Sequence, residues 1–327
     1  MLPTLKEITN NLLAEPLDHL SARKAAYELY DFFAGMAALE NDVAENNAHI
    51  KTKNGLAIST NAAAICTIDY MRTRTFLLGI KKAIADCFVS NPNKPVELLY
   101  AGTGPFATLV IPLLSYFTSA QLQLVLLEIN SNTIDILKST IKNLGVEKYV
   151  KAIIQCDACT YNFEGDIQPS IIVSETMKPA LFKEPQVILM TNLVKQCKQI
   201  PIMIPQLISV DLASFNTTSK EISLLDNLIT FNIETALQLG SDTNHAPIFK
   251  EGIKIDINRK NKTTKDKISL LTTINSYGMY KLDYNECSLT LPCYMDKLNI
   301  SDKDVLLRVK YKVGEKPGLV FETISES

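Results

Sequence analysis

Residues 168–185, QPSIIVSETMKPALFKEP, decide how the chain is organised. The short apolar run at 171–173 predicts a buried strand that ends at Ser174. Two carboxylates follow on one loop, Glu175 at once and Glu184 nine positions later. Neighbouring carboxylates repel each other unless a cation lies between them, and a planar guanidinium pairs bidentately with carboxylates. The segment therefore indicates a cation-binding loop, although Glu175 as a helix cap and Glu184 as a solvated surface charge would also fit.

Length and composition limit the class of protein. The chain has 327 residues, enough for two domains, and is 46% hydrophobic and 21% charged, as in ordinary folded proteins. Its net charge of −2 creates no basic field for nucleic acid or an anionic membrane. The start, MLPTLKEITNNLL, lacks the pattern of a signal peptide, and no apolar run is long enough to span a bilayer. These features predict a cytoplasmic protein without nucleic-acid or membrane partners.

The seven cysteines are scattered, and without a secretory signal they indicate reduced thiols. Cys156 and Cys159 form a CxxC pair, but no second pair at metal spacing and no nearby histidine accompanies them. We expect a structural pair and no metal site.

The first 48 or so residues predict helices, because Leu5, Ile8 and Leu12 recur at helical spacing. Ser21 is a candidate cap for a second helix that carries Tyr27, Leu29, Tyr30, Phe32 and Phe33. This apolar surface either covers the next domain or pairs with a second subunit. We therefore expect a homodimer.

A further helix is predicted from Ser59 or Asn61, either of which can cap it, to Ile80. It carries Arg72 and Arg74, which point to different faces at this spacing. At most one of the two is expected to turn into a site, and two solvated arginines are the alternative.

From Pro95 the pattern becomes strand, turn and helix. Strands are predicted at 96–100, 123–127, 150–154 and 171–173, with a glycine turn at 101–107 and helices at 108–116 and 134–144. This alternation favours a parallel, doubly wound sheet. The glycine turn lets the backbone and a free helix N-terminus approach a ligand closely, and Glu128, at the end of the second strand, is placed to accept hydrogen bonds from ribose hydroxyls.

After Pro205 the segments are strand-like, which predicts a mostly antiparallel β domain. The polar stretch 258–267 is interpreted as a hairpin loop. We expect a helical segment at 1–55, a Rossmann-like domain at 56–206 and a β-barrel-like domain at 207–327. The predicted strands of the last part lie at 207–212, 253–257, 269–274, 288–291, 305–313 and 319–321.

The order of these features separates two families that share a G-x-G-x-x-A turn. A nicotinamide enzyme needs no Ser174–Glu175 after the fourth strand, whereas this order is typical of class I S-adenosylmethionine (SAM) methyltransferases. From about Ala57 to its end, and best over 101–205, the chain resembles the protein arginine methyltransferase family. SETM at 174–177 with Glu184 is similar to that family's double-E loop, and MRTRTF at 71–76 is similar to its cofactor-binding helix.

The resemblance implies that SAM is the cofactor and that no metal takes part. It implies that Arg72 binds the methionine carboxylate of SAM and that Glu128 binds the ribose. Asp157 lies where class I methyltransferases often place an adenine contact. The remaining residues expected at the cofactor are Ala101, Gly102, Thr103, Gly104 and Ala158.

The resemblance also implies that Glu175 and Glu184 are catalytic and grip a guanidinium, with Met177 on the same loop at the substrate. An arginine-rich protein tail usually needs an acidic groove, and the net charge here is only slightly negative. We therefore prefer free L-arginine or a small guanidino metabolite as the substrate, with arginine in proteins close behind.

The chain departs from the family pattern at several positions. Tyr100 replaces the first glycine of the turn motif, and Leu98 replaces the strand acid, with Glu97 displaced by one position. The chain has no tryptophan, so the family's Thr-His-Trp element is absent. His245 is a candidate substitute at the substrate, or else a surface histidine.

Two alternatives stay open. A class I methyltransferase for another small amine or hydroxyl compound would use one or both glutamates on an ammonium. A catalytically silent SAM-binding partner is favoured by Leu98 and Tyr100, and disfavoured by the presence of Arg72 and the two loop glutamates.

Overall fold

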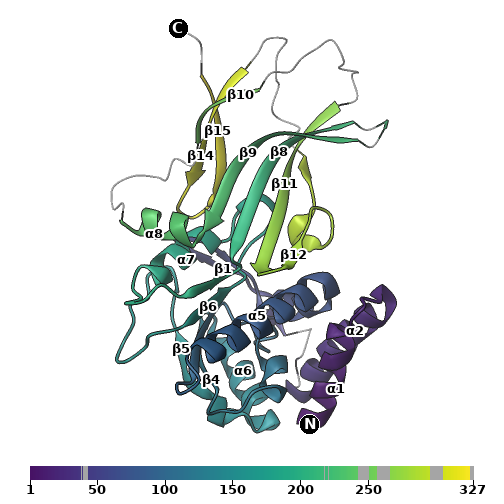
Figure 1. Cartoon of the computed structure of the whole chain (residues 1–327), viewed down its shortest axis with the longest axis vertical. Coiled ribbons are helices and arrows are strands. Elements are labelled where there is room, and N and C mark those ends of the chain that lie inside the picture. The colour runs from purple at the N-terminus through teal and green to yellow at the C-terminus, as the bar shows by residue number, and fades with distance from the viewer. Residues whose placement is uncertain are drawn as a thin grey trace.

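The computed structural model describes residues 1–37, 39, 43–216, 218–219, 221–241, 250–255, 266–294 and 305–324. Its lower part in Figure 1 is a parallel sheet with helices, and its upper part consists of antiparallel strands. The predicted hairpin loop at 258–267 falls almost wholly outside the described residues. The α/β class, with an antiparallel β-rich part and N-terminal helices, is confirmed.

Five parallel strands form the first sheet in the order β5-β4-β3-β6-β7. The central strand β3 has β4 on one side and β6 on the other, so the chain reverses its direction of winding beside β3. In doubly wound sheets, ligands bind outside the carboxyl ends of the strands at this point. The strands are β3 (Val96–Ala101), β4 (Leu122–Glu128), β5 (Val150–Gln155), β6 (Ile171–Ser174) and β7 (Ile202–Ile204).

The helix predicted from Ser59 to Ile80 is in fact broken. It consists of α4 (Thr60–Ile65), the 3₁₀ turn η1 (Cys66–Ile68) and α5 (Tyr70–Ser90). Ser59 caps α4, as one of the two predicted alternatives had it. The break occurs at Asp69, which has a non-helical ψ of 84° and whose side chain accepts a hydrogen bond from the Arg72 N–H. An N-cap aspartate starts a new helix there, so that Arg72 lies in the first turn of α5.

The helix predicted at 108–116 is also wrong. Turns and the 3₁₀ helix η2 (Ile111–Ser115) occupy this segment. Pro112 has no N–H to donate, and Ala107 has a φ of 42°, so an α-helical ladder cannot form. The α-helix expected directly after the glycine turn is therefore not formed at 108–116. The next helix, α6 (Ser131–Leu144), ends at a left-handed Gly145, as the sequence predicts.

Two antiparallel sheets follow, with the strand orders β12-β11-β8-β9 and β10-β14-β15, and β13 pairs with β11. The segment predicted as a strand at 288–291 is instead the 3₁₀ helix η6 (Ser288–Thr290). The strands are β8 (Leu207–Asn216), β9 (Ile222–Asn232), β10 (Lys250–Ile255), β11 (Asp266–Tyr277), β12 (Tyr280–Leu282), β13 (Cys293–Tyr294), β14 (Val305–Lys312) and β15 (Gly318–Ile324).

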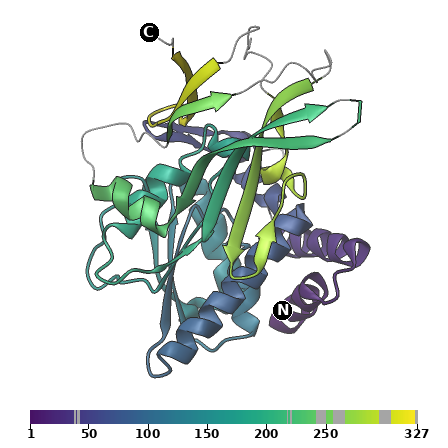
Figure 2. The same cartoon turned by 45° about the horizontal axis from the view of Figure 1, so that its top comes forward.

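Helix α5 joins the two parts, because it packs against β11 and β12 (Figure 2). A Cβ atom at Gly79 would lie 2.3 Å from the Ser276 Oγ, so only glycine allows this approach. Farther along α5, the carboxylate of Asp86 accepts a hydrogen bond of 3.3 Å from the Tyr277 hydroxyl. The helix that begins with Arg72 is thus fixed to the β-rich part.

The N-terminal helices α1 (Leu2–Leu13) and α2 (His19–Ala37) pack on the parallel-sheet part (Figure 1). A shorter helix, α3 (Ala44–Asn47), follows them. Helix α2 begins before Ser21, and it is Asp18 that accepts a hydrogen bond of 3.2 Å from the Leu20 N–H, so the predicted cap is wrong. The buried side chain of Arg74 donates to the Ala14 carbonyl at 3.0 Å, which ties α1 to α5.

The apolar N-terminal surface therefore covers the chain's own core. Leu5, Leu12, Leu29 and Phe33 are fully buried within it. The homodimer stays a prediction, and this surface no longer argues for it. Within the described parts of the chain, no helix combines the length and apolar character that crossing a membrane requires.

We expect Phe33→Ala to lower the free energy of unfolding by about 3–5 kcal/mol, as buried phenylalanine truncations do. Phe33 is fully buried, and its ring stacks on Phe106 with 5.3 Å between centroids. Leu20→Ala, at an 80% exposed position of the same helix, is the control and should change it by less than about 0.5 kcal/mol. Urea unfolding measures both. Equal effects would mean that α2 is not part of the folded core.

Candidate active site

A cleft with about 1000 Å³ of empty space, part of it open to solvent, lies at the carboxyl edge of the parallel sheet. Its wall includes the hairpin of β1 (Ile50–Thr52) and β2 (Gly55–Ala57), together with the break between α4 and α5. Of the residues predicted for the site, those that line it are Arg72, Gly102, Thr103, Gly104, Glu128, Asp157, Ala158, Glu175 and Glu184.

Two predicted residues are not brought to this wall. Ala101 and Met177 are buried in the core and do not line the cleft. His245 lies outside the described residues, so its predicted role is not tested. Residues that the sequence analysis did not assign to the site, among them Cys66, Thr176 and Leu189, line the cleft as well, and so does Tyr100, which replaces the first glycine of the turn motif.

Glu128 ties the glycine turn to the end of β4. Its carboxylate accepts hydrogen bonds from the backbone N–H groups of Gly104 at 3.0 Å, Ile129 at 2.9 Å and Asn130 at 3.1 Å. Burial raises the pKa of Glu128, and these hydrogen bonds oppose that rise. Gly102 has a φ of 72°, and a Cβ atom there would lie 2.4 Å from the Thr176 Cγ2. Position 102 therefore has to be glycine, because the loop after β6 leaves no room for a side chain there.

Asp157 lies between the turn after β5 and the β1–β2 hairpin. Its Oδ1 accepts a hydrogen bond of 2.9 Å from the Cys159 N–H, and the Asn54 amide donates to its Oδ2 at 3.4 Å. Cys156 and Cys159 are free thiols, and burial raises the pKa of Cys156 to about 12. Among the described residues, no group of three or more His, Cys, Asp or Glu side chains could hold a metal ion.

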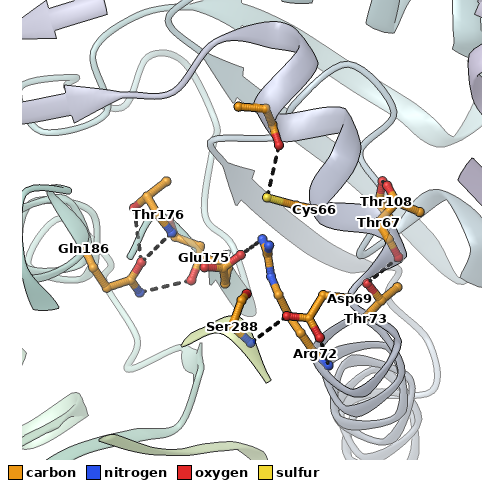
Figure 3. A network of polar contacts seen from close by, with 12 residues as sticks. Cys66, Thr67, Asp69, Arg72, Thr73, Thr108, Glu175, Thr176, Gln186 and Ser288 are labelled. Carbon is orange, nitrogen blue, oxygen red and sulfur yellow. Dashed lines mark hydrogen bonds and ion pairs between the residues drawn. The ribbon is translucent and has the colours of Figure 1, made fainter. Parts of the chain in front are cut away.

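The central feature of the cleft is an ion pair between Arg72 and Glu175 (Figure 3). The Arg72 side chain is 11% exposed and that of Glu175 is 2% exposed, so both charges are withdrawn from water. Within the described structure, the Nε of Arg72 has no hydrogen-bond partner. Only one of the two arginines lines the cleft, as predicted. However, neither is solvated, because Arg74 is buried against α1.

Glu184 has a cation of its own. The Nζ of Lys178 lies 3.6 Å from the Glu184 Oε1, and the Lys178 side chain is 44% exposed, against 7% for Glu184. Burial raises the pKa of Glu184, while Lys178 and Arg72 oppose that rise. Each glutamate of the loop is therefore accompanied by a positive charge from the chain.

Gln186, the first residue of α7 (Gln186–Val194), holds the loop in shape and was missed by the sequence analysis. Its amide donates to the Ser174 carbonyl at 3.0 Å, and its carbonyl accepts from the Thr176 N–H at 2.9 Å. Because Gln186 is fully buried, these hydrogen bonds are shielded from water. The signal in the sequence was a glutamine at the start of an apolar helix, which local pattern alone does not connect to Ser174.

The β-rich part supports the other side of the loop. The Tyr311 hydroxyl donates to the Leu181 carbonyl at 3.2 Å, and the Thr272 hydroxyl accepts from the Ala180 N–H at 2.8 Å. The Lys183 N–H donates to the Pro317 carbonyl at 2.8 Å. Ala180, Leu181 and Lys183 all have left-handed φ values, of 57°, 58° and 68°, which residues other than glycine rarely adopt. Surrounding contacts hold this strained backbone in place.

The turn η6 reaches the same region from the β-rich part (Figure 3). The Asp69 Oδ2 accepts a hydrogen bond of 2.8 Å from the Ser288 N–H, while its Oδ1 caps α5. The Ser288 N–H group of the β-rich part thus donates to the residue that caps α5, the helix that carries Arg72. Glu97, the displaced acid, does not line the cleft but pairs with Lys151, whose Nζ lies 2.6 Å from the Glu97 carboxylate. Tyr100 lines the cleft and is buried, and burial raises its pKa.

Neither a protein-family model nor a curated protein matches the chain. Two similar solved structures are PRMT6 and Arabidopsis thaliana protein arginine methyltransferase 10. PRMT6 gives a TM-score of 0.55 at 11% identity and covers 80% of this chain and 98% of its own. The Arabidopsis protein gives a TM-score of 0.50 at 9% identity and covers 78% and 96%. The chain therefore shares its fold with these two structures.

We expect Glu184→Gln to stabilise the fold increasingly as the pH rises. The folded pKa of Glu184 is raised above its usual 4.5, so from that pH upward the folded state keeps a proton that the unfolded state releases. Stability is then lost with rising pH, and glutamine removes this loss. Urea unfolding at pH 5 and pH 7.5 measures the difference. The control Glu147→Gln, at an exposed turn, should give the same small difference at both pH values; a pH-independent effect of Glu184→Gln would contradict the prediction.

Proposed function

We propose that the chain is a SAM-dependent N-methyltransferase that acts on a guanidino group. The observation that carries the proposal is the ion pair in which Glu175 already binds a guanidinium, that of Arg72. A loop that holds one guanidinium on a buried carboxylate, with Glu184 lining the same cleft, has the charge to bind another.

The residues of the cleft fit SAM. The Glu128 carboxylate uses three acceptor positions on backbone N–H groups and keeps capacity for ribose hydroxyls. Asp157 and Ala158 would flank the base, and the 102–104 turn would contact the methionine part. When bound, SAM supplies an electrophilic methyl group on a sulfonium sulfur.

Arg72 would serve two carboxylates in turn. In the structure it binds Glu175, and its unpartnered Nε is a donor available to the methionine carboxylate. Movement of Arg72 to that carboxylate would release Glu175 for the substrate. The cofactor would then bind before the substrate, because Glu175 is otherwise taken.

Glu175 and Glu184 would hold the substrate guanidinium and leave one nitrogen facing the methyl group. A guanidinium does not lose its proton in water, so it must be activated while charged. The two carboxylates draw its positive charge toward themselves and away from the attacking nitrogen. As the new N–C bond formed, the S–CH₃ bond of SAM would break and its electron pair would stay on sulfur, leaving S-adenosylhomocysteine. The N–H proton would pass to Glu184, whose raised pKa suits a late proton acceptor.

A catalytically silent SAM-binding partner is the second candidate. It is supported by the occupation of both glutamates by Arg72 and Lys178, and by Tyr100 in the cleft wall. If these cations never leave, no guanidinium can enter.

Mass spectrometry of reactions with SAM tests the proposal. One reaction contains free arginine and the other an arginine–glycine-rich peptide. A gain of one methyl mass on either substrate supports the proposed function and identifies the substrate class. SAM binding without methylation of either would favour the silent partner or another substrate.

Glu175→Gln and Arg72→Met should change SAM affinity in opposite directions. Glu175→Gln weakens the hold on Arg72, so SAM should bind at least as tightly, while turnover falls by about 10²–10³-fold or more. Arg72→Met removes a charged hydrogen bond and should weaken SAM binding by roughly 10–100-fold. Calorimetry measures both, with the exposed Arg23→Met as the control. Loss of SAM binding in Glu175→Gln would refute this division of roles.

A further inference from the structure

Lys178 lies between the two glutamates in the sequence of the loop, and its backbone is held in place. Its backbone is extended, with φ −114° and ψ 166°, and its carbonyl accepts a hydrogen bond of 2.9 Å from the Leu181 N–H. Because Ala180 and Leu181 are anchored to Thr272 and Tyr311, the lysine stem starts from an immobile point. Its ammonium lies 3.6 Å from the Oε1 of Glu184, and Glu184 lines the cleft.

The hold of Glu184 on Lys178 is weak. A distance of 3.6 Å exceeds that of a direct hydrogen bond, and the lysine side chain is nearly half exposed. The ammonium sits on a flexible four-carbon stem and can turn to a better acceptor. Its position is therefore open to a ligand that brings an anion.

The charges of the site point to that anion. Glu175 and Glu184 are balanced by Arg72 and Lys178 in the structure. If Arg72 moves to the cofactor, two negative charges and the positive charge of Lys178 remain for the substrate. A substrate guanidinium bound there lies close to an ammonium, which repels it. An anionic group on the substrate that meets Lys178 converts this repulsion into attraction.

We propose that the substrate is a small guanidino compound that also carries a carboxylate, and that Lys178 binds this carboxylate. The inference rests on the proposed function and deepens it, because it selects a free amino acid of the arginine type. An arginine residue inside a polypeptide has a neutral peptide group in place of the carboxylate, so Lys178 discriminates against it. Lys178 is thereby a specificity-determining residue, and Glu175 and Glu184 retain their roles.

The test compares L-arginine with agmatine, which has the same guanidino group and chain but no carboxylate. With SAM present, the wild-type protein should use arginine with a kcat/KM at least about tenfold higher, because a charge-assisted contact is lost in agmatine. In Lys178→Gln the ratio of the two kcat/KM values should fall toward one. Lys178→Arg keeps the charge and should keep most of the preference.

Lys183→Gln is the matched control, since it changes an exposed lysine of the same loop. It should keep the wild-type ratio. Urea unfolding establishes that each variant is folded. Equal use of arginine and agmatine by the wild type, or an unchanged ratio in Lys178→Gln, would overturn the inference, as would methylation of an arginine–glycine-rich peptide alone.

Failure of the proposed function gives a different result. If nothing is methylated, calorimetry with S-adenosylhomocysteine present still compares the binding of arginine and agmatine. A preference for arginine that Lys178→Gln abolishes supports the role of Lys178 even then. Binding of both with equal affinity, or of neither, overturns it.

Discussion

Glu175 and Glu184 are both buried on one loop and line the same cleft, and a carboxylate withdrawn from water needs a cation or several donors beside it. The chain supplies one cation to each, Arg72 from α5 and Lys178 from the loop itself. Removing either cation would leave a buried charge without compensation. The order of elements around the cleft can be understood from this requirement, since α5 must begin where its first turn can reach Glu175. Asp69 sets that start, because it caps α5 and stops the preceding 3₁₀ turn.

The loop between the glutamates is strained, and the rest of the molecule holds it. Three of its residues have left-handed φ values, which an isolated segment would not keep. Gln186 closes the loop from within, and β11, β14 and the segment before β15 hold it from outside. The β-rich part is therefore more than an attached domain, because it contributes to the shape of the site. Its second connection, from the Ser288 N–H to Asp69, fixes the helix that carries Arg72.

Local pattern predicted the parallel strands and the acidic end of β4, because short buried runs followed by a glycine turn or a carboxylate are features of neighbouring residues. It failed where the decisive contact is distant in the sequence. The segment 108–116 has the apolar composition of a buried helix, but Pro112 and the left-handed conformation of Ala107 prevent a helix from forming. Arg74 looks like a solvated residue until α1 folds over it. Gln186 and Lys178 have no local signature, and their roles appear only once the loop has folded back on itself.

The N-terminal helices explain how the glycine turn is supported without an α-helix behind it. In a doubly wound fold the helix after the first strand normally packs on the sheet and fixes the turn. Here 105–116 is a series of turns and a 3₁₀ helix. Phe33 of α2 stacks on Phe106, and Asn10 of α1 accepts a hydrogen bond of 2.5 Å from the Tyr116 hydroxyl. The ammonium of Lys81 from α5 lies 3.8 Å from the centroid of the Tyr116 ring. Packing from outside the segment thus replaces the missing helical ladder, so the N-terminal helices support the glycine-turn side of the cleft.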